Sequence, residues 1–393
     1  MKNSVNLVST PTKIRQNWIP FLNGLRAIAI LLVISCHFGI SSNLSGWVSF
    51  HPWYNRYFLN GDLGVQIFFV LSGYLITYLL IQEEERCGKI SARKFIARRL
   101  LRIVPVLFVY VLLLNLGLVI CGLFQIPSPV SLWNFVSSYF NYQVWGDLSK
   151  SAWIGHFWSL SFEIKFYFFW LLVLLIFKIH WWRFLVLVLI VLSPISRYYL
   201  ANFPSKLNPY LLTTLQHTLQ HKFHTGMDTI LIGCSLALWQ HHSRLTRFFQ
   251  IFRSPIWLMI ASCYIFIIAE DLRLRLNYSW LLPLKISLDV LVLGFIVGWI
   301  IHHPQRWPGR LLENRVLQHI GTLSYSIYIW QQPFIYVLPN NYPIFIYLGI
   351  PITYLVALIS YHYIEMPINR LRGRFHQGAV PEIVPRNQTE SSK

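Results

Sequence analysis

The chain has 393 residues, of which 55% are hydrophobic and 12% are charged, whereas soluble domains are about 25% charged. The mean hydropathy of +0.49 indicates that a lipid bilayer is its main solvent, which excludes an ordinary soluble enzyme. The formal net charge of +19 is therefore interpreted first as membrane topology, and not as a surface for nucleic acid. The five cysteines include no CxxC pair, so neither a disulfide scaffold nor a structural zinc site is encoded.

Hydropathy predicts an all-α, polytopic membrane protein with about ten transmembrane helices. A spanning helix needs roughly 20 mostly apolar residues, and the sixth segment is the weakest because it contains Gly226, Asp228 and Gly233. The first segment is expected to stay attached, since no small-residue cleavage site follows it. The ten segments are 20–39, 62–82, 103–124, 159–177, 184–200, 225–240, 255–269, 280–301, 318–338 and 343–363.

Lys and Arg residues are distributed unevenly between the two sides of this frame. With the N-terminus in the cytoplasm, 23 of the 33 lie on the inner side, 7 on the outer side and three inside spans. This positive-inside signal predicts that both termini are cytoplasmic. We expect a cytoplasmic tail at 1–19, a membrane domain at 20–368 and a cytoplasmic, disordered tail at 369–393. The outer segment 125–158 is expected to pack over the helices as a lid or re-entrant piece.

Ionisable residues inside spans are costly, so each is a candidate functional residue. Arg26 and His37 are eleven positions apart in the first segment, which places both on one helical face about 16 Å apart. Glu163 lies near the outer start of the fourth segment, in the stretch 156–163. We expect His37 and Glu163 to meet at one depth, where a carboxylate orients an imidazole that acts as general base. The alternative is that Arg26 snorkels to the inner headgroups and His37 lies at the outer interface.

Cations precede the third segment, and most of them are ordinary topology signals. Arg99 and Arg102 differ, because three residues apart on a helix they share a face and can clamp a phosphorylated ligand. In the second segment, Gly64, Ser72 and Gly73 are expected to let neighbouring helices approach closely. The ninth segment carries a polar stripe at 321–332, which indicates a hydrated cavity or contacts between helices.

Six short motifs follow one another along this frame. They are Gly24-Leu25-Arg26 through His37, Gly64-Val65 to Ile76, Arg98-Arg99-Leu100-Leu101-Arg102, Trp158-Ser159-Leu160 with Glu163 and Phe166-Tyr167, Ser324-Tyr325-Ser326-Ile327-Tyr328 to Pro333, and Tyr363-Ile364-Glu365-Met366-Pro367. In this order, from about residue 18 to 374, they resemble the acyltransferase-3 family of integral membrane acyltransferases.

The resemblance implies an O-acyltransferase of the plasma membrane. Its donor would be acyl-CoA, usually acetyl-CoA, supplied from the cytoplasm as a co-substrate, with no permanently bound cofactor and no metal. Its acceptor would be a hydroxyl on a sugar of a surface polysaccharide, lipopolysaccharide, glycolipid or related glycosylated molecule. A covalent acyl-histidine intermediate is an alternative route, and the oligomeric state is left open.

The resemblance also assigns expected roles to individual residues. The catalytic residues would be His37 and Glu163, and the residues that bind the donor would be Arg26, Arg99 and Arg102. The remaining substrate-binding residues would be Trp158, Ser159, Asp228, Tyr328 and Gln331.

The sequence departs from the family pattern in three places. Relatives often have His where this chain has Gln331, and many carry a C-terminal esterase-like domain, for which this chain is too short. Relatives often show Thr-Arg-x-Asp before the sixth segment, where this chain has Thr225-Gly226-Met227-Asp228. We therefore expect Asp228 to lack its usual arginine partner.

Three rival interpretations stay open. The main one is a polytopic transporter or flippase, which ten spans with buried charges also fit, although the two halves show no similarity to each other. A scaffold without chemistry does not explain ionisable residues inside hydrocarbon. A metal site at His217, His221 and His224 is conceivable from their helical spacing, but a solvated face explains these histidines more simply.

Overall fold

The fold is a bundle of helices, and the computed structural model contains no strand in any part of the chain that it describes. This confirms the predicted all-α class. The described residues are 20–44, 60–121, 152–177, 179–202, 223–240, 242–275, 281–341 and 344–374. The tail at 1–19, most of the segment 125–158 and the part of the predicted C-terminal tail after residue 374 lie outside them, so the predictions for those parts stay predictions.

Among the described residues, seven helical stretches are long and apolar enough to cross a membrane. An eighth candidate is the pair α11 (Ser243–Ile251) and α12 (Pro255–Cys263), whose axes differ by 85° at a short break. The seven stretches lie in α1 (Pro20–Leu44), α3 (Gly61–Cys87), α4 (Ala92–Cys121), α7 (Phe157–Ile176), α8 (Ile179–Asn202), α14 (Leu282–His302) and α18 (Ile344–Ser360) with its continuation to Leu371.

The predicted count of ten spans is therefore not confirmed, although every predicted segment overlaps a helix. The sixth segment overlaps α10 (Phe223–Trp239), whose apolar part is only Gly226–Trp239. The ninth overlaps α16 (Arg315–Gln331), which is not among the candidate spans. Both helices carry polar side chains into the interior of the bundle, and this lowers their apolar content.

Short helices and π-helical turns complete the described chain. Pro333 has no N–H for an α-helical bond, and the π-helical segment that contains it begins one residue earlier. The last helix runs to Arg374, past the expected domain boundary at 368. The remaining elements are η3 (Ala152–Ile154), η4 (Tyr264–Ile268), α13 (Ala269–Arg275), α15 (Trp307–Leu312), η5 (Gln332–Val337), α17 (Leu338–Asn341), η6 (Tyr361–Glu365) and α19 (Met366–Arg374).

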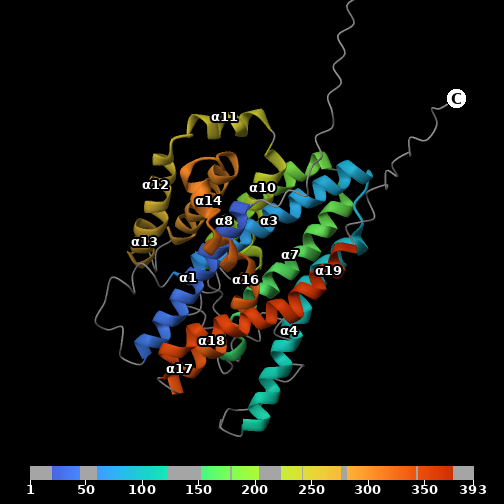
Figure 1. Cartoon of the computed structure of the whole chain (residues 1–393). Helices are drawn as coiled ribbons and strands as arrows, with labels where there is room; N and C mark the ends of the chain where they lie inside the picture. Colours follow the sequence, from blue (N-terminus) through green and yellow to red (C-terminus); the bar gives the residue numbers. More distant parts are fainter. Residues whose placement is uncertain are drawn as a thin grey trace, which may run out of the picture.

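Helix α3 packs against both α1 and α10, and α1 packs against α16 (Figure 1). Gly73 lets α3 and α10 cross very closely, because a Cβ added to it would lie 2.0 Å from the carbonyl oxygen of Ile230 in α10. A Cβ at Gly64 would lie 2.4 Å from the carbonyl oxygen of Ala29 in α1. The predicted role of these two glycines in close helix packing is confirmed.

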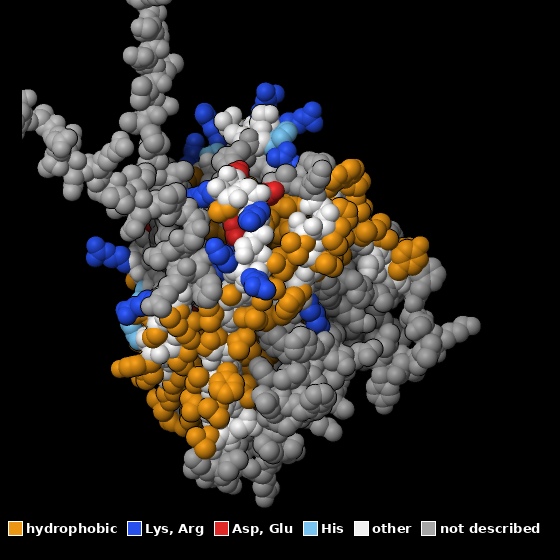
Figure 2. Space-filling model, turned by 90° about the vertical axis from the view of Figure 1, so that its right-hand side faces the viewer, with side chains coloured by type: hydrophobic (Ala, Val, Ile, Leu, Met, Phe, Trp, Pro, Cys, Tyr) orange, Lys and Arg blue, Asp and Glu red, His pale blue; other side chains and the backbone are white. Residues whose placement is uncertain are grey.

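Large apolar side chains cover the outside of the bundle. Leu112, Leu172, Val191, Leu291 and Leu355 are each more than half exposed, as expected for side chains that face lipid. On the face drawn in Figure 2, hydrophobic side chains cover a broad area, and Lys and Arg gather towards the upper end. The apolar surface and the grouped cations fit a protein that sits in a bilayer.

Candidate active site

His37 is oriented by a side chain at the end of α16. Its Nδ1 lies 2.8 Å from Oε1 of Gln331, and its ring lies 5.3 Å from the ring of Tyr336, centroid to centroid. A carboxamide oxygen can only accept a hydrogen bond, so Nδ1 of His37 donates and Nε2 keeps its lone pair. This is the tautomer that a general base needs, with one nitrogen fixed and the other able to take a proton.

Glu163 does not pair with His37, contrary to the expectation from the sequence. Its two carboxylate oxygens accept hydrogen bonds from Ser72 at 2.6 Å and from Tyr167 at 2.8 Å. The partner of His37 is Gln331, so an amide takes the place that we had expected a carboxylate to occupy.

The reason for this difference is depth along the helices. Glu163 is seven residues, about 10 Å, beyond His156 at the start of α7. Glu163 lines the same cavity as Arg26. Arg26 is about 16 Å from His37 along α1. His156, and not Glu163, therefore comes to the level of His37.

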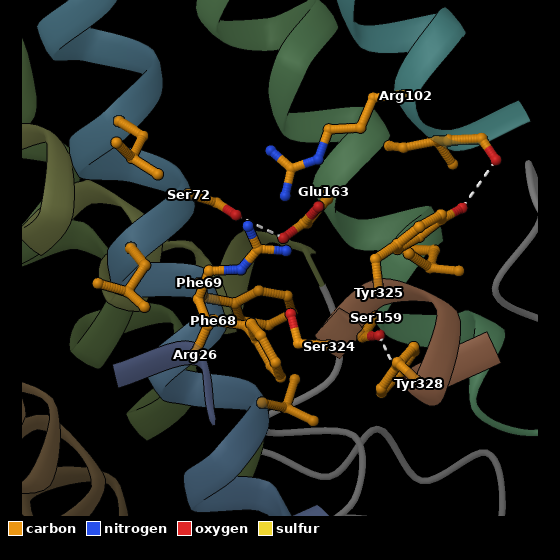
Figure 3. A pocket seen from close by; sticks show the side chains of 15 residues that line it. Arg26, Phe68, Phe69, Ser72, Arg102, Ser159, Glu163, Ser324, Tyr325 and Tyr328 are labelled. Atoms are coloured by element: carbon orange, nitrogen blue, oxygen red, sulfur yellow. Dashed lines mark hydrogen bonds between the residues drawn. The ribbon is translucent and has the colours of Figure 1, made fainter. Parts of the chain in front are cut away.

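A large cavity lies between α1, α3, α4, α7 and α16. It encloses about 650 Å³ of empty space, including the part that opens to solvent. Figure 3 shows the guanidinium groups of Arg26 and Arg102 pointing towards the carboxylate of Glu163. Two cations and one anion leave the cavity with a surplus of positive charge, which suits an anionic substrate.

Arg99 lies in a different pocket from Arg102. Its guanidinium carbon is 5.6 Å from the ring centre of Phe95 and 5.5 Å from that of Tyr167. The two arginines are on α4 as the spacing predicts, and Tyr167 lies close enough to interact with both charges. Only Arg102 lines the large cavity, so the shared phosphate clamp stays a prediction.

Ser159 and Tyr328 form a polar wall of the large cavity. The oxygen atoms of their hydroxyl groups are 2.6 Å apart, and the Tyr328 hydroxyl also donates to the backbone carbonyl of His156 at 2.7 Å. The ring of Tyr328 meets Phe68 edge to face at 6.4 Å. The structure thus brings these two predicted substrate-binding residues together, with their hydroxyl groups inside the protein.

Asp228 has an arginine partner, which corrects the expectation that it lacks one. Arg197 of α8 donates to both carboxylate oxygens of Asp228, at 3.1 Å and 2.5 Å, and to Ser287 at 2.8 Å. Arg197 is one of the seven cations that the positive-inside count assigned to the outer side, but it belongs to α8, which extends to Asn202, and it is completely buried. Where relatives often have an arginine two residues before this aspartate, the chain has Gly226. The arginine that pairs with Asp228 therefore comes from another helix.

A second cavity lies on the other side of Phe69. It encloses about 350 Å³ of empty space and shares Val65 and Phe69 with the large cavity. Trp158, another predicted substrate-binding residue, lies here and meets Phe69 edge to face at 6.0 Å. The polar side chains in its wall are Asp62, Gln66, Arg197 and Thr229.

His156 is a buried residue of this region to which the sequence analysis gave no role. Its side chain packs among aromatic rings, with centroid distances of 4.5 Å to Phe157, 5.4 Å to Tyr328 and 5.8 Å to Tyr110. The signal was present in the stretch 156–163, but the sequence did not show which of its ionisable residues lies at the level of His37.

No group of three or more His, Cys, Asp or Glu side chains could hold a metal ion among the described residues. The alternative metal site involves His217 and His221, which lie outside them, and the side chain of His224, which is not described either.

One known protein family matches most of this chain. The family described as "Acyltransferase domain", acyltransferase-3, matches residues 19–362. The chain belongs to the acyltransferase-3 family. All the candidate site residues of this acyltransferase-3 chain lie inside the matched region.

Named relatives share the membrane part of this acyltransferase-3 chain. The peptidoglycan O-acetyltransferase OatA of Listeria monocytogenes is 28% identical over 91% of the chain and 57% of its own length. The O-acetyltransferase OatA of Staphylococcus aureus is 30% identical over 90% of the chain and 57% of its own length. A putative O-acetyltransferase of Staphylococcus aureus is 26% identical, with 91% and 58% covered. The chain thus spans a little over half the length of these relatives, and no solved structure matches it.

Proposed function

We propose that this acyltransferase-3 protein is a plasma-membrane O-acetyltransferase. It moves an acetyl group from acetyl-CoA to a hydroxyl of a sugar in a surface polysaccharide, lipopolysaccharide or glycolipid. The observation that carries the proposal is the cavity in which Arg26 and Arg102 point towards Glu163, together with His37 farther along α1. Relatives named O-acetyltransferases support the choice of an acetyl group and a hydroxyl acceptor.

Charge supports acetyl-CoA as the donor. The phosphates of CoA are anionic, and guanidinium groups bind phosphate with paired hydrogen bonds. Arg26 is about 16 Å from His37 along α1, a distance comparable with the length of the pantetheine arm. A donor whose phosphates meet Arg102 and Arg26 can therefore present its thioester near His37.

The second cavity supports a sugar as the acceptor. An indole from Trp158 and polar groups from Asp62, Gln66 and Thr229 line it, and such a set suits a ring with several hydroxyl groups. One relative is named a peptidoglycan O-acetyltransferase, and peptidoglycan contains sugar chains. Asp62 is exposed, so the cavity lies near the surface at the end of the bundle where α3 begins.

In the proposed reaction, Nε2 of His37 takes the proton from the acceptor hydroxyl. The hydroxyl oxygen then forms a bond with the carbonyl carbon of the thioester. The carbon–sulfur bond breaks, and the CoA thiolate leaves and receives the proton from His37. The products are the acetylated sugar and free CoA, and His37 returns to its starting form.

Membrane vesicles that contain the protein and its native acceptor test this proposal. We expect isotope label from acetyl-CoA, added on the cytoplasmic side, to appear in extracted glycan or glycolipid. The matched control uses vesicles from cells that lack the protein. Movement of an unmodified solute across the membrane without transfer of label would support a transporter instead and would overturn the proposal.

A further inference from the structure

The imidazole of His156 is buried, and both of its ring nitrogens lack a well-formed hydrogen bond to the described part of the chain. The residue is 4% exposed, and neither ring nitrogen bonds to another described residue with normal geometry, although the backbone of Ile329 lies nearby. Buried polar groups in proteins nearly always have partners, because an unpaired one loses its hydration without compensation. His156 lies beside the proposed active site, so a ligand that binds there would explain why its imidazole has no such partner.

Gln331 also has a buried polar group without a partner, the nitrogen atom of its side-chain amide. Its side chain is completely buried, and its oxygen accepts the hydrogen bond from His37. Its amide nitrogen Nε2 has no partner among the described residues. An amide nitrogen only donates hydrogen bonds, so Nε2 of Gln331 can donate one to an oxygen atom of a ligand.

Helix α16 holds these groups on neighbouring turns. Tyr328 and Gln331 are three residues apart, so they share a face of the helix about 4.5 Å apart along its axis. Tyr328 contacts His156 through its ring and through its hydroxyl group, and Gln331 holds His37. The charge of His37 is close enough to act on His156. Two imidazoles from α1 and from the start of α7 therefore meet at one end of α16.

We propose that His156 and the amide nitrogen of Gln331 bind the carbonyl oxygen of the acyl group during transfer. This inference rests on the proposed function and adds two catalytic residues to it. When the acceptor oxygen attacks the carbonyl carbon, the carbonyl oxygen gains the negative charge. A ring N–H of His156 and the Gln331 amide donate hydrogen bonds to that oxygen until the carbon–sulfur bond breaks. His37 alone gains and loses a proton.

Variants of His156 in the vesicle assay with labelled acetyl-CoA test the first donor. We expect His156→Phe to lower kcat about 10²- to 10³-fold, with little change in the KM for acetyl-CoA, because the carbonyl oxygen becomes negative only during transfer. His156→Gln keeps an N–H donor and should recover part of kcat. Trp170→Phe is the matched control, since it removes a buried, unpaired N–H on the same helix, 14 residues farther along, and should leave kcat unchanged.

Variants of Gln331 separate this role from simple positioning of His37. Gln331→Glu keeps an oxygen for His37 but loses the donor, so we expect kcat to fall at least about tenfold, and to fall further in Gln331→Met, which loses both groups. If Gln331 only orients His37, Gln331→Glu should retain activity close to that of the unmodified protein. That result would overturn the role of the Gln331 amide.

The outcomes distinguish the inference from the function on which it rests. Absence of transfer by the unmodified protein overturns both. Transfer by the unmodified protein and equally by His156→Phe overturns the inference alone. Thermal unfolding and the amount of protein in the membrane are measured for each variant. If His156→Phe does not fold, His156→Gln decides. A kcat below that of Trp170→Phe with a normal KM supports the inference, and a kcat equal to that of Trp170→Phe contradicts it.

Discussion

Arg197 and Asp228 form a bidentate ion pair whose side chains are 1% and 3% exposed. Two charges in such a place are tolerated only because each compensates the other. Lys285 and Asp289 form a second pair at 2.5 Å within α14. At the scale of single residues, burial in the bundle thus goes together with a specific partner, and removal of one partner should be costly.

Asp228→Asn should destabilise the protein by about 3–5 kcal/mol, because it leaves the buried guanidinium of Arg197 uncompensated. The double variant Arg197→Met with Asp228→Leu should recover much of this loss, since no buried charge remains. Thermal unfolding in detergent measures both. Equal destabilisation by the single and double variants would show that the two charges are not coupled.

Glu163→Gln should lower the KM for acetyl-CoA about tenfold, about 1.4 kcal/mol, because Arg26 and Arg102 can then bind the anionic phosphates without a carboxylate that competes for them. The exposed Glu85 provides the control Glu85→Gln, which should have no effect. Initial rates at varied acetyl-CoA concentrations measure KM and kcat for both variants. A fall in kcat at constant KM would instead assign Glu163 to proton transfer beside His37.

Single residues also show which parts of the site can be predicted from the sequence and which cannot. Periodicity placed Arg26 and His37 on one face of one helix, because this follows from helix geometry alone. The partner of His37 could not be found in that way, because it is Gln331 on another helix, α16. The residue of α7 that lies at the level of His37 depends on the depth of α7 relative to α1, which the sequence does not show. Arg197 was missed as the partner of Asp228 because the two are 31 residues apart and belong to different helices.

At the scale of elements, α3 is the helix on which the site depends. Its glycines bring α1 and α10 close, Ser72 holds Glu163, and Phe69 separates the two cavities. The sequence predicted α3 and its small residues well, because an apolar stretch with glycines has few other interpretations in a membrane. It predicted the number of spans less well, since α10 and α16 are interior helices with polar side chains.

Gly73→Ala should destabilise the crossing of α3 and α10 by about 1–3 kcal/mol or more, because the new methyl group would overlap the backbone of Ile230. Gly117→Ala on α4 is the control, since a Cβ there meets nothing within 4 Å, and it should be neutral or slightly stabilising. Thermal unfolding compares them. Similar stability of the two variants would mean that the helices do not approach as closely as described.

At the scale of the whole molecule, the distribution of Lys and Arg predicts how the protein is oriented in the membrane. The end of α3 and the start of α4 carry a dense group of Lys and Arg residues, which predicts the cytoplasmic side. The start of α3, with Asp62 and the second cavity, then faces outward. Donor and acceptor would accordingly reach the bundle from opposite sides of the membrane.

Cys87, exposed at the end of α3, tests this orientation in a variant whose other cysteines are replaced. A thiol reagent that cannot cross membranes should label Cys87 in inside-out vesicles and leave it unlabelled in intact cells. Labelling in intact cells alone would reverse the assigned orientation. The readout needs no enzymatic activity, so it stands apart from the proposed reaction.

The transfer rate of His37→Ala tests the central claim most directly. In vesicles with equal amounts of inserted protein and the native acceptor, the rate of label transfer from acetyl-CoA should fall at least about 10²- to 10⁴-fold, because the general base is lost. A rate within about threefold of that of the unmodified protein, less than about 1 kcal/mol in the barrier, would contradict the account.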